Sequence, residues 1–217
     1  IVLIIVFFFS CSTNYAQQKE KPYSKDLIKV EERLREGNFP EALGMLDAIT
    51  TNYPDASDVF YAKALLFGQV GNLDNALLNA EIAYRQDPSL VYANYLIELN
   101  KSKKDWPKVI DILSTMREHY PTITGLSRDL LTTMGSTGNL EGALKIYEEE
   151  KDKGLHSDTL DVALSDVYFH TTKIKEGIAL LEPWRGKSSL SNVYGRLAYG
   201  YLEDGKTKTA IAVLEQG

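Results

Sequence analysis

The chain has 217 residues, 44% of them hydrophobic and 25% charged, which is typical of a folded protein and argues against global disorder. Its net charge of −6 at pH 7 disfavours binding to nucleic-acid phosphates, because such binding needs a basic face. The single cysteine, Cys11, excludes an internal disulfide framework, and the three histidines have no partner at metal-ligand spacing. We therefore expect no metal site and no cofactor.

The first nine residues form an uninterrupted apolar run. As an ideal helix they would span about 14 Å, roughly half of a bilayer core. The run is too short to cross a membrane, but it has the length of the apolar core of a signal peptide. We predict an export signal within residues 1–16, followed by a polar tether over residues 17–22.

Two cleavage sites fit this signal. Residues 8–11, Phe-Phe-Ser-Cys, resemble the lipobox of bacterial lipoproteins, although Phe9 departs from the small residue that is usual there. Cleavage before Cys11 would leave this cysteine lipidated, whereas the alternative cleavage after Ala16 would remove it. The position of Cys11 at the end of the apolar run favours lipidation. Either site predicts an exported, periplasmic protein, and the first predicts a membrane anchor.

Beyond the tether, a six-residue unit recurs six times. It consists of a turn residue, one further residue, an apolar residue, two further residues and a small residue. The first position falls at residues 37, 71, 104, 138, 172 and 205, so the spacing is always 33 or 34 residues. Clear copies are residues 37–42 (GNFPEA), 71–76 (GNLDNA) and 138–143 (GNLEGA). Such regular recurrence predicts a repeat protein.

Each copy has the chemistry of a turn between two helices. A glycine in first place supplies the left-handed backbone that ends a helix. The next residue is Asn38, Asn72, Asp105 or Asn139 in four copies, and its side chain can accept a backbone N–H to cap the following helix. The small residue lets the two helices approach closely.

The second helix of each hairpin is predicted to be amphipathic. Four residues after the small position, on the same helical face, stands a mostly apolar residue. These residues are Leu46, Ala80, Leu113, Tyr147, Leu181 and Leu214. Prolines at positions 54, 88 and 121 then stop three of the second helices.

The period of 34 residues, the helix–turn–helix units, the small residues at fixed offsets and the closing prolines resemble the tetratricopeptide repeat (TPR). The resemblance implies an all-α, right-handed solenoid of helical hairpins, with about six repeats and the last one truncated. These repeats cover residues 23–56, 57–90, 90–123, 124–157, 158–190 and 191–217 of an array spanning 23–217.

Some positions depart from the family pattern. Lys29 and Arg33 replace apolar residues in the first repeat, which suits a solvent-facing end cap. Asn100 replaces an apolar residue in the third repeat. Pro183 falls inside the second helix of the fifth repeat, and we expect it to shorten or kink that helix, since an interior proline costs about 3 kcal/mol.

In TPR proteins the first helix of each hairpin lines a concave surface, so the resemblance implies a partner groove at the equivalent positions. Their mixture of aromatic, charged and amide side chains suits peptide recognition. An ordinary solvated helix face is the alternative interpretation. The implied groove residues are Tyr61, Leu65, Asn94, Tyr95, Glu98, Lys101, Arg128, Asp129, Thr132, Asp166, Phe169, His170, Arg196, Tyr199 and Glu203.

The sequence contains no nucleophile motif, phosphate-binding loop, dinucleotide-binding loop or HExxH motif, so we assign no catalytic residue. The favoured function is a non-enzymatic protein–protein interaction scaffold in the bacterial cell envelope, with proteins or peptides as partners and no nucleic acid. Two alternatives stay open. The repeats are the docking or regulatory arm of a larger protein whose catalytic or transport domain lies beyond residue 217, or the groove aromatics bind carbohydrate or cell wall.

Overall fold

The computed structural model describes residues 21–217, so the expected export signal, Cys11 and the first part of the tether lie outside the described residues. Over the described range all regular structure is helical, with twelve α-helices, one 3-10 turn and no strand. The all-α fold class is therefore confirmed. The chain divides between Lys104 and Asp105 into two compact units. Within residues 21–217, no helix combines the length and the hydrophobicity needed to cross a membrane.

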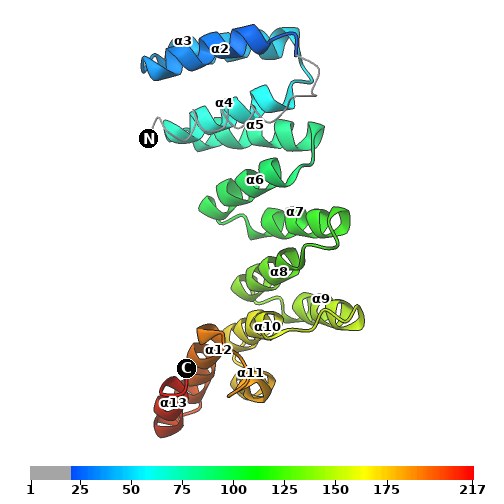
Figure 1. Ribbon diagram of the computed structural model, residues 1–217, viewed down its shortest axis with the longest axis vertical. Helices are drawn as coiled ribbons and strands as arrows, with labels where there is room; N and C mark the ends of the chain where they lie inside the picture. Colours follow the sequence, from blue (N-terminus) through cyan, green and yellow to red (C-terminus); the bar gives the residue numbers. More distant parts are fainter. Residues whose placement is uncertain (1–20) are drawn as a thin grey trace. The chain divides into compact units, whose positions relative to one another are not determined.

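Unit 1 contains five helices in its described part (Figure 1). Each helix packs against the next one in the chain, and α4 packs most extensively against α5, beside which it lies in Figure 1. The unit is thus a series of helical hairpins. Its helices are α2 (Ser24–Arg35), α3 (Phe39–Asn52), α4 (Ser57–Gln69), α5 (Leu73–Gln86) and α6 (Leu90–Ser102).

Unit 2 contains seven α-helices and the 3-10 turn η2. Besides the contacts between chain neighbours, α8 packs against α10 and α10 against α12. The first helices of three successive hairpins therefore form one layer. The elements are α7 (Trp106–His119), α8 (Thr124–Thr137), α9 (Leu140–Asp152), α10 (Asp158–His170), α11 (Ile174–Leu181), η2 (Glu182–Trp184), α12 (Ser191–Glu203) and α13 (Thr207–Leu214).

The turn that opens each repeated unit is left-handed in all six copies. Four copies use glycine, with φ of 75° at Gly37, 76° at Gly71, 68° at Gly138 and 75° at Gly205. The other two use Lys104, with φ of 58°, and Thr172, with φ of 62°. The backbone therefore keeps one conformation at this position even where the residue disfavours it.

The predicted helix caps are confirmed. The side-chain oxygens of Asn38, Asn72, Asp105 and Asn139 each accept a hydrogen bond from the backbone N–H three residues later. Each bond satisfies one of the N–H groups that a helix leaves free at its start. The turn and the cap together explain why the second helix starts at the same place in these repeats.

The small residue of the repeated unit lies in the core in all six copies. The apolar residue one turn later is also buried at Leu46, Ala80, Leu113, Tyr147 and Leu181, whereas Leu214 on α13 is 55% exposed. One core cluster of unit 1 gathers around Val30, Leu46 and Val59, and one of unit 2 around Leu181, Leu197 and Val213. The predicted amphipathic faces are thus the ones that pack.

Pro183 shortens the second helix of the fifth repeat, as expected. Helix α11 ends at Leu181 after 8 residues, whereas α9 has 13. The chain continues as η2, which contains the proline, because the ring removes an N–H donor and clashes with the preceding turn. This change of direction places the Trp184 indole N–H 2.6 Å from the Asp161 carboxylate on α10.

The other departures from the repeat pattern also have local explanations. Lys29 is exposed and pairs with Asp26, while Arg33 is partly exposed and pairs with Glu41, so the first helix has a charged outer face. Asn100 is buried, and its amide donates to the carbonyl oxygen of Leu96 at 2.8 Å. A buried amide is tolerated there because its hydrogen bond is satisfied within the helix.

Replacing Thr172 by glycine is expected to raise the free energy of unfolding by about 0.5–1 kcal/mol. A β-branched residue in the left-handed region carries about 1–2 kcal/mol of steric strain, and the entropy that glycine adds to the unfolded chain offsets part of the gain. Urea denaturation followed by circular dichroism measures the change.

Gly205→Ala, at the same position of the next repeat, is expected to change the free energy of unfolding in the opposite direction. It should lower the free energy of unfolding by about 1 kcal/mol, because alanine must adopt a φ of 75° there. A Thr172→Gly variant no more stable than the wild type would contradict the strain at this turn.

Candidate functional site

In unit 1 the candidate face lies on α4 and α6, where Tyr61, Tyr92 and Tyr95 form a tyrosine cluster. The ring centroid of Tyr61 lies 4.8 Å from that of Tyr92 and 5.7 Å from that of Tyr95. The Tyr95 hydroxyl donates to the carbonyl oxygen of Ala64 at 3.2 Å. Gly68 leaves room for this hydroxyl, since a Cβ there would lie 2.2 Å from its oxygen. The rings are thus held in place by the protein itself.

Tyr61 is the buried member of the tyrosine cluster, so its ring is covered by its neighbours. It is only 8% exposed, and burial, with a smaller effect of the neighbouring tyrosines, raises its pKa to about 12. Burial also raises the pKa of Tyr95, which is partly exposed. Both phenols therefore stay neutral, and Tyr92 and Tyr95 are the partly exposed rings of the cluster.

The remaining predicted residues of unit 1 lie on the same two helices. Asn94 and Glu98 are exposed on α6, and the Lys101 ammonium lies 2.9 Å from the Glu98 carboxylate. Leu65 on α4 is half-buried. This face therefore combines aromatic, amide and charged groups, as the repeat pattern implied.

In unit 2 the candidate face lies on α10 and α12, which an ion pair joins. The Arg196 Nε lies 2.7 Å from Asp166 Oδ1, with the arginine side chain 49% exposed and the aspartate 15% exposed. Burial raises the pKa of Asp166, and the charges of Arg196 and His170 oppose this rise. The His170 Nδ1 also lies 2.7 Å from the Asp166 carbonyl oxygen. The largely covered carboxylate thus positions an exposed guanidinium.

A ring pair lies on the same two helices. The centroids of Phe169 and Tyr199 are 5.4 Å apart in an edge-to-face arrangement. Phe169 is 7% exposed, whereas Tyr199 is 43% exposed. Phe169 fits because Gly177 on α11 and Gly200 on α12 lack side chains, and a Cβ would lie 2.4 Å and 2.9 Å from its ring, respectively. We call Asp166, Phe169, His170, Arg196 and Tyr199 the α10–α12 face.

On α8 the predicted residues contact one another. The Nε and Nη2 atoms of Arg128 donate to Asp129 Oδ1 at 2.9 and 2.7 Å. The Thr132 hydroxyl donates to the Arg128 carbonyl oxygen at 3.0 Å. Glu203, the last predicted residue, is exposed at the end of α12.

The structure brings the side chains of five pairs of predicted residues into contact with each other. They are Tyr61–Tyr95, Glu98–Lys101, Arg128–Asp129, Asp166–Arg196 and Phe169–Tyr199. Sequence reasoning missed Tyr92, although it stands three residues before Tyr95 and so on the same side of the helix. It also missed the glycines at positions 68 and 200, whose place inside predicted helices signals a close approach.

No group of three or more histidine, cysteine or acidic side chains within residues 21–217 is placed to hold a metal ion.

Comparison with known proteins finds similarity at the level of structure. A tetratricopeptide repeat protein from Parabacteroides merdae ATCC 43184 superposes with a TM-score of 0.64, over 89% of this chain and 77% of its own, at 14% identity. The thermophilic TPR protein TTC0263 from Thermus thermophilus has a TM-score of 0.51, over 75% and 92%, at 18% identity. MamA also has a TM-score of 0.51, over 89% and 88%, at 12% identity. No family model and no curated protein matches the sequence.

Similarity at such low identity shows the fold alone. The chain has the fold of tetratricopeptide repeat proteins, and the expectation drawn from the repeat period is confirmed.

Replacing Gly200 by alanine is expected to lower the free energy of unfolding by about 1–3 kcal/mol. The new Cβ would lie 2.8 Å from Ile178 Cγ1 and 2.9 Å from the Phe169 ring, and both neighbours are buried. The resulting overpacking exceeds the gain of about 1 kcal/mol in helix propensity.

Gly195→Ala, in the same helix, is the matched control. No atom lies within 4 Å of its Cβ position, so this change should raise the free energy of unfolding by about 0.5–1 kcal/mol. Urea denaturation of both variants measures the two effects. Changes of the same sign would contradict the packing described for the α10–α12 face.

Proposed function

We propose that this chain is a non-enzymatic protein–protein interaction scaffold of the bacterial cell envelope, which binds partner proteins or peptides on the faces of its first helices. The observation that carries the proposal is the α10–α12 face. There an exposed arginine pairs with the largely covered carboxylate of Asp166, and an exposed tyrosine packs on the buried ring of Phe169.

Arginine and tyrosine are the residue types that dominate binding energy at protein interfaces. Side chains that a monomer already holds in place lose less conformational entropy when a partner binds. Arg196 is held by the Asp166 carboxylate, and Tyr199 packs on the Phe169 ring. The tyrosine cluster of unit 1 has the same construction, with Tyr95 resting on Tyr61. Both faces are therefore suited to peptide recognition.

The buried acid Glu150 lies outside both candidate faces and is held in its ionised form. Glu150 accepts from Arg117 at 2.6 Å and from Lys153 at 3.0 Å. Burial alone would raise the pKa of Glu150, but the hydrogen bonds from Arg117 and Lys153 lower it below its ordinary value. A carboxylate held in its ionised form by cations is a poor general acid.

The cell-envelope setting is part of the same proposal. It is supported by the apolar run at residues 1–9 and by the position of Cys11 two residues after its end, both in the part of the sequence before residue 21. A lipid chain contributes about 0.8 kcal/mol per buried CH₂ group, so several chains on one cysteine anchor a protein stably.

The double variant Tyr199→Ala/Arg196→Gln is expected to reduce recovery of the principal protein partners at least about tenfold, because one such interface residue contributes about 2 kcal/mol or more. Cross-linked affinity purification from the native cell, followed by mass spectrometry, compares the variant with the wild type. Tyr95→Ala tests the face of unit 1 in the same way.

The control is Lys145→Ala/Lys208→Ala, which truncates two exposed side chains on the second helices α9 and α13. It should recover the same partners as the wild type. Circular dichroism verifies that each variant is folded. A folded Tyr199→Ala/Arg196→Gln variant that retains every partner would contradict a role of the α10–α12 face in binding.

Cys11→Ala is expected to move the protein from the membrane fraction to the soluble fraction and to abolish incorporation of labelled fatty acid, because the thiol that carries the lipid is lost. Ser12→Ala, at the neighbouring position, should leave both readouts unchanged. Unaltered fractionation of Cys11→Ala would show that the signal is cleaved elsewhere or that another segment holds the protein at the membrane.

A further inference from the structure

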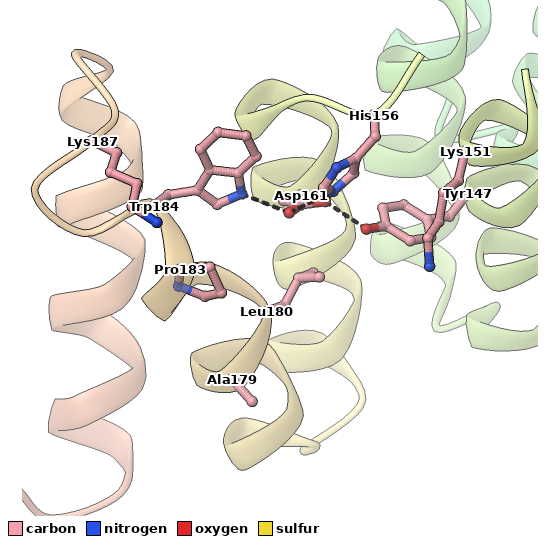
Figure 2. A pocket seen from close by; sticks show the side chains of 9 residues that line it. All are labelled: Tyr147, Lys151, His156, Asp161, Ala179, Leu180, Pro183, Trp184 and Lys187. Atoms are coloured by element: carbon pink, nitrogen blue, oxygen red, sulfur yellow. Dashed lines mark hydrogen bonds and ion pairs between the residues drawn. The ribbon is translucent and has the colours of Figure 1, made fainter. Parts of the chain in front are cut away.

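A pocket opens in unit 2 where α11 stops at Leu181. Its volume is about 440 Å³, within the range of about 300–1,000 Å³ that is typical of ligand sites. Leu180, Pro183 and Trp184 supply apolar lining, and Lys151 and Lys187 also line it (Figure 2). Because α11 stops before the proline, η2 follows and brings Trp184 to Asp161 in the pocket wall. The pocket shares no residue with the α10–α12 face.

A buried carboxylate organises the pocket wall. Asp161 is 2% exposed and accepts from the Tyr147 hydroxyl at 2.6 Å and from the Trp184 indole N–H at 2.6 Å. The His156 Nε2 lies 3.0 Å from each of its oxygens. Both oxygens are therefore occupied by donors from the protein, and Asp161 holds three aromatic side chains in place.

These aromatic side chains form a continuous row. The His156 ring centroid lies 6.2 Å from that of Tyr147 and 5.8 Å from that of Trp184. Figure 2 shows Lys187 beside Trp184 at one end of the row and Lys151 beside Tyr147 at the other. The pocket wall is therefore aromatic along its length, with an ammonium group at each end.

The two lysines are available to a ligand. The Lys151 ammonium lies 3.7 Å from the Glu148 carboxylate, in a loose pair at an exposed position. Lys187 is exposed and forms no ion pair with any residue between 21 and 217. Because the oxygens of Asp161 are already occupied, the charged groups that the pocket offers are hydrogen-bond donors.

A ligand cation is the other candidate, since aromatic rings near a carboxylate can hold a quaternary ammonium group. Here the lining carries two cations, Lys151 and Lys187, against one carboxylate, Asp161, whose oxygens already accept hydrogen bonds from the protein. Charge complementarity therefore favours an anion, and the apolar lining favours one that carries an apolar group.

We propose that this pocket binds an acidic peptide segment of a partner protein. An aromatic or aliphatic side chain of the segment packs on Trp184 and Pro183, and carboxylates on either side of it pair with Lys151 and Lys187. This inference rests on the proposed function in taking the partner to be a protein. Since the pocket is a different surface from the α10–α12 face, the pocket proposal and the proposed function can each be wrong without the other.

The test uses the peptide acetyl-Glu-Phe-Glu-amide, titrated into the protein and followed by isothermal calorimetry and by the indole N–H resonance of Trp184. We expect saturable binding with a shift of that resonance. Lys151→Ala and Lys187→Ala should each weaken binding about threefold to tenfold, because each removes one partly exposed ion pair. Lys145→Ala, an exposed lysine on α9 outside the pocket, should leave binding unchanged.

Two matched peptides separate the contributions of charge and apolar contact. Acetyl-Gln-Phe-Gln-amide keeps the shape but removes the charges, and acetyl-Glu-Ala-Glu-amide keeps the charges but removes the ring. Each should bind at least about fivefold more weakly than the parent peptide.

Equal affinity of the charged and the uncharged peptide would overturn the proposal, as would binding that both lysine variants retain. A shift of the Trp184 resonance with tetramethylammonium but not with the acidic peptide would overturn the proposal in favour of a cation site.

The variant Tyr199→Ala/Arg196→Gln should bind the peptide like the wild type. If that variant loses its cellular partners while the peptide still binds, both surfaces are supported, and a peptide that does not bind at all overturns the pocket alone.

Discussion

Each hairpin that lies within one unit depends on the close approach of two helices at one small residue. Ala42, Ala76 and Ala143 are wholly buried at this position, and glycine takes the place at residue 177. A larger side chain would separate the two helices, because packed cores do not absorb extra volume without strain. The left-handed turn and the side-chain cap before it set where the second helix starts. With the hairpins closed in this way, the first helices keep one side free for other contacts.

The helices, their caps and the effect of Pro183 follow from local rules, so the sequence predicts them well. A cap needs one polar side chain and a backbone N–H three residues away, and a proline stops a helix wherever it stands. The positions of the small residues likewise predict which helix faces are buried. These features depend on residues close together in the chain, and sequence patterns report such neighbours directly.

The detailed roles of the site residues depend on contacts between distant segments, which the sequence does not show. Tyr61 and Phe169 occupy positions expected in a groove, yet both are buried. Each packs against an aromatic ring of the next first helix, Tyr61 against Tyr95 and Phe169 against Tyr199. The Phe169 ring can be buried because glycines on two other helices leave space for it. In the same way, the row of rings around Asp161 exists only because η2 brings Trp184 back to α10.

The short helix α11 also affects where local unfolding of unit 2 is expected to begin. In a repeat protein each hairpin is stabilised mainly by its own packing and by that of its immediate neighbours, so a weak hairpin is a point of local unfolding. With 8 residues, α11 offers fewer internal hydrogen bonds than the 13-residue α9, and the turn after it combines local backbone hydrogen bonds with side-chain bonds from Trp184 and Ser188 to α10. Amide hydrogens of this segment are therefore expected to exchange with solvent earlier than those of α8–α9, so that the fifth repeat would be the place where local unfolding of unit 2 begins.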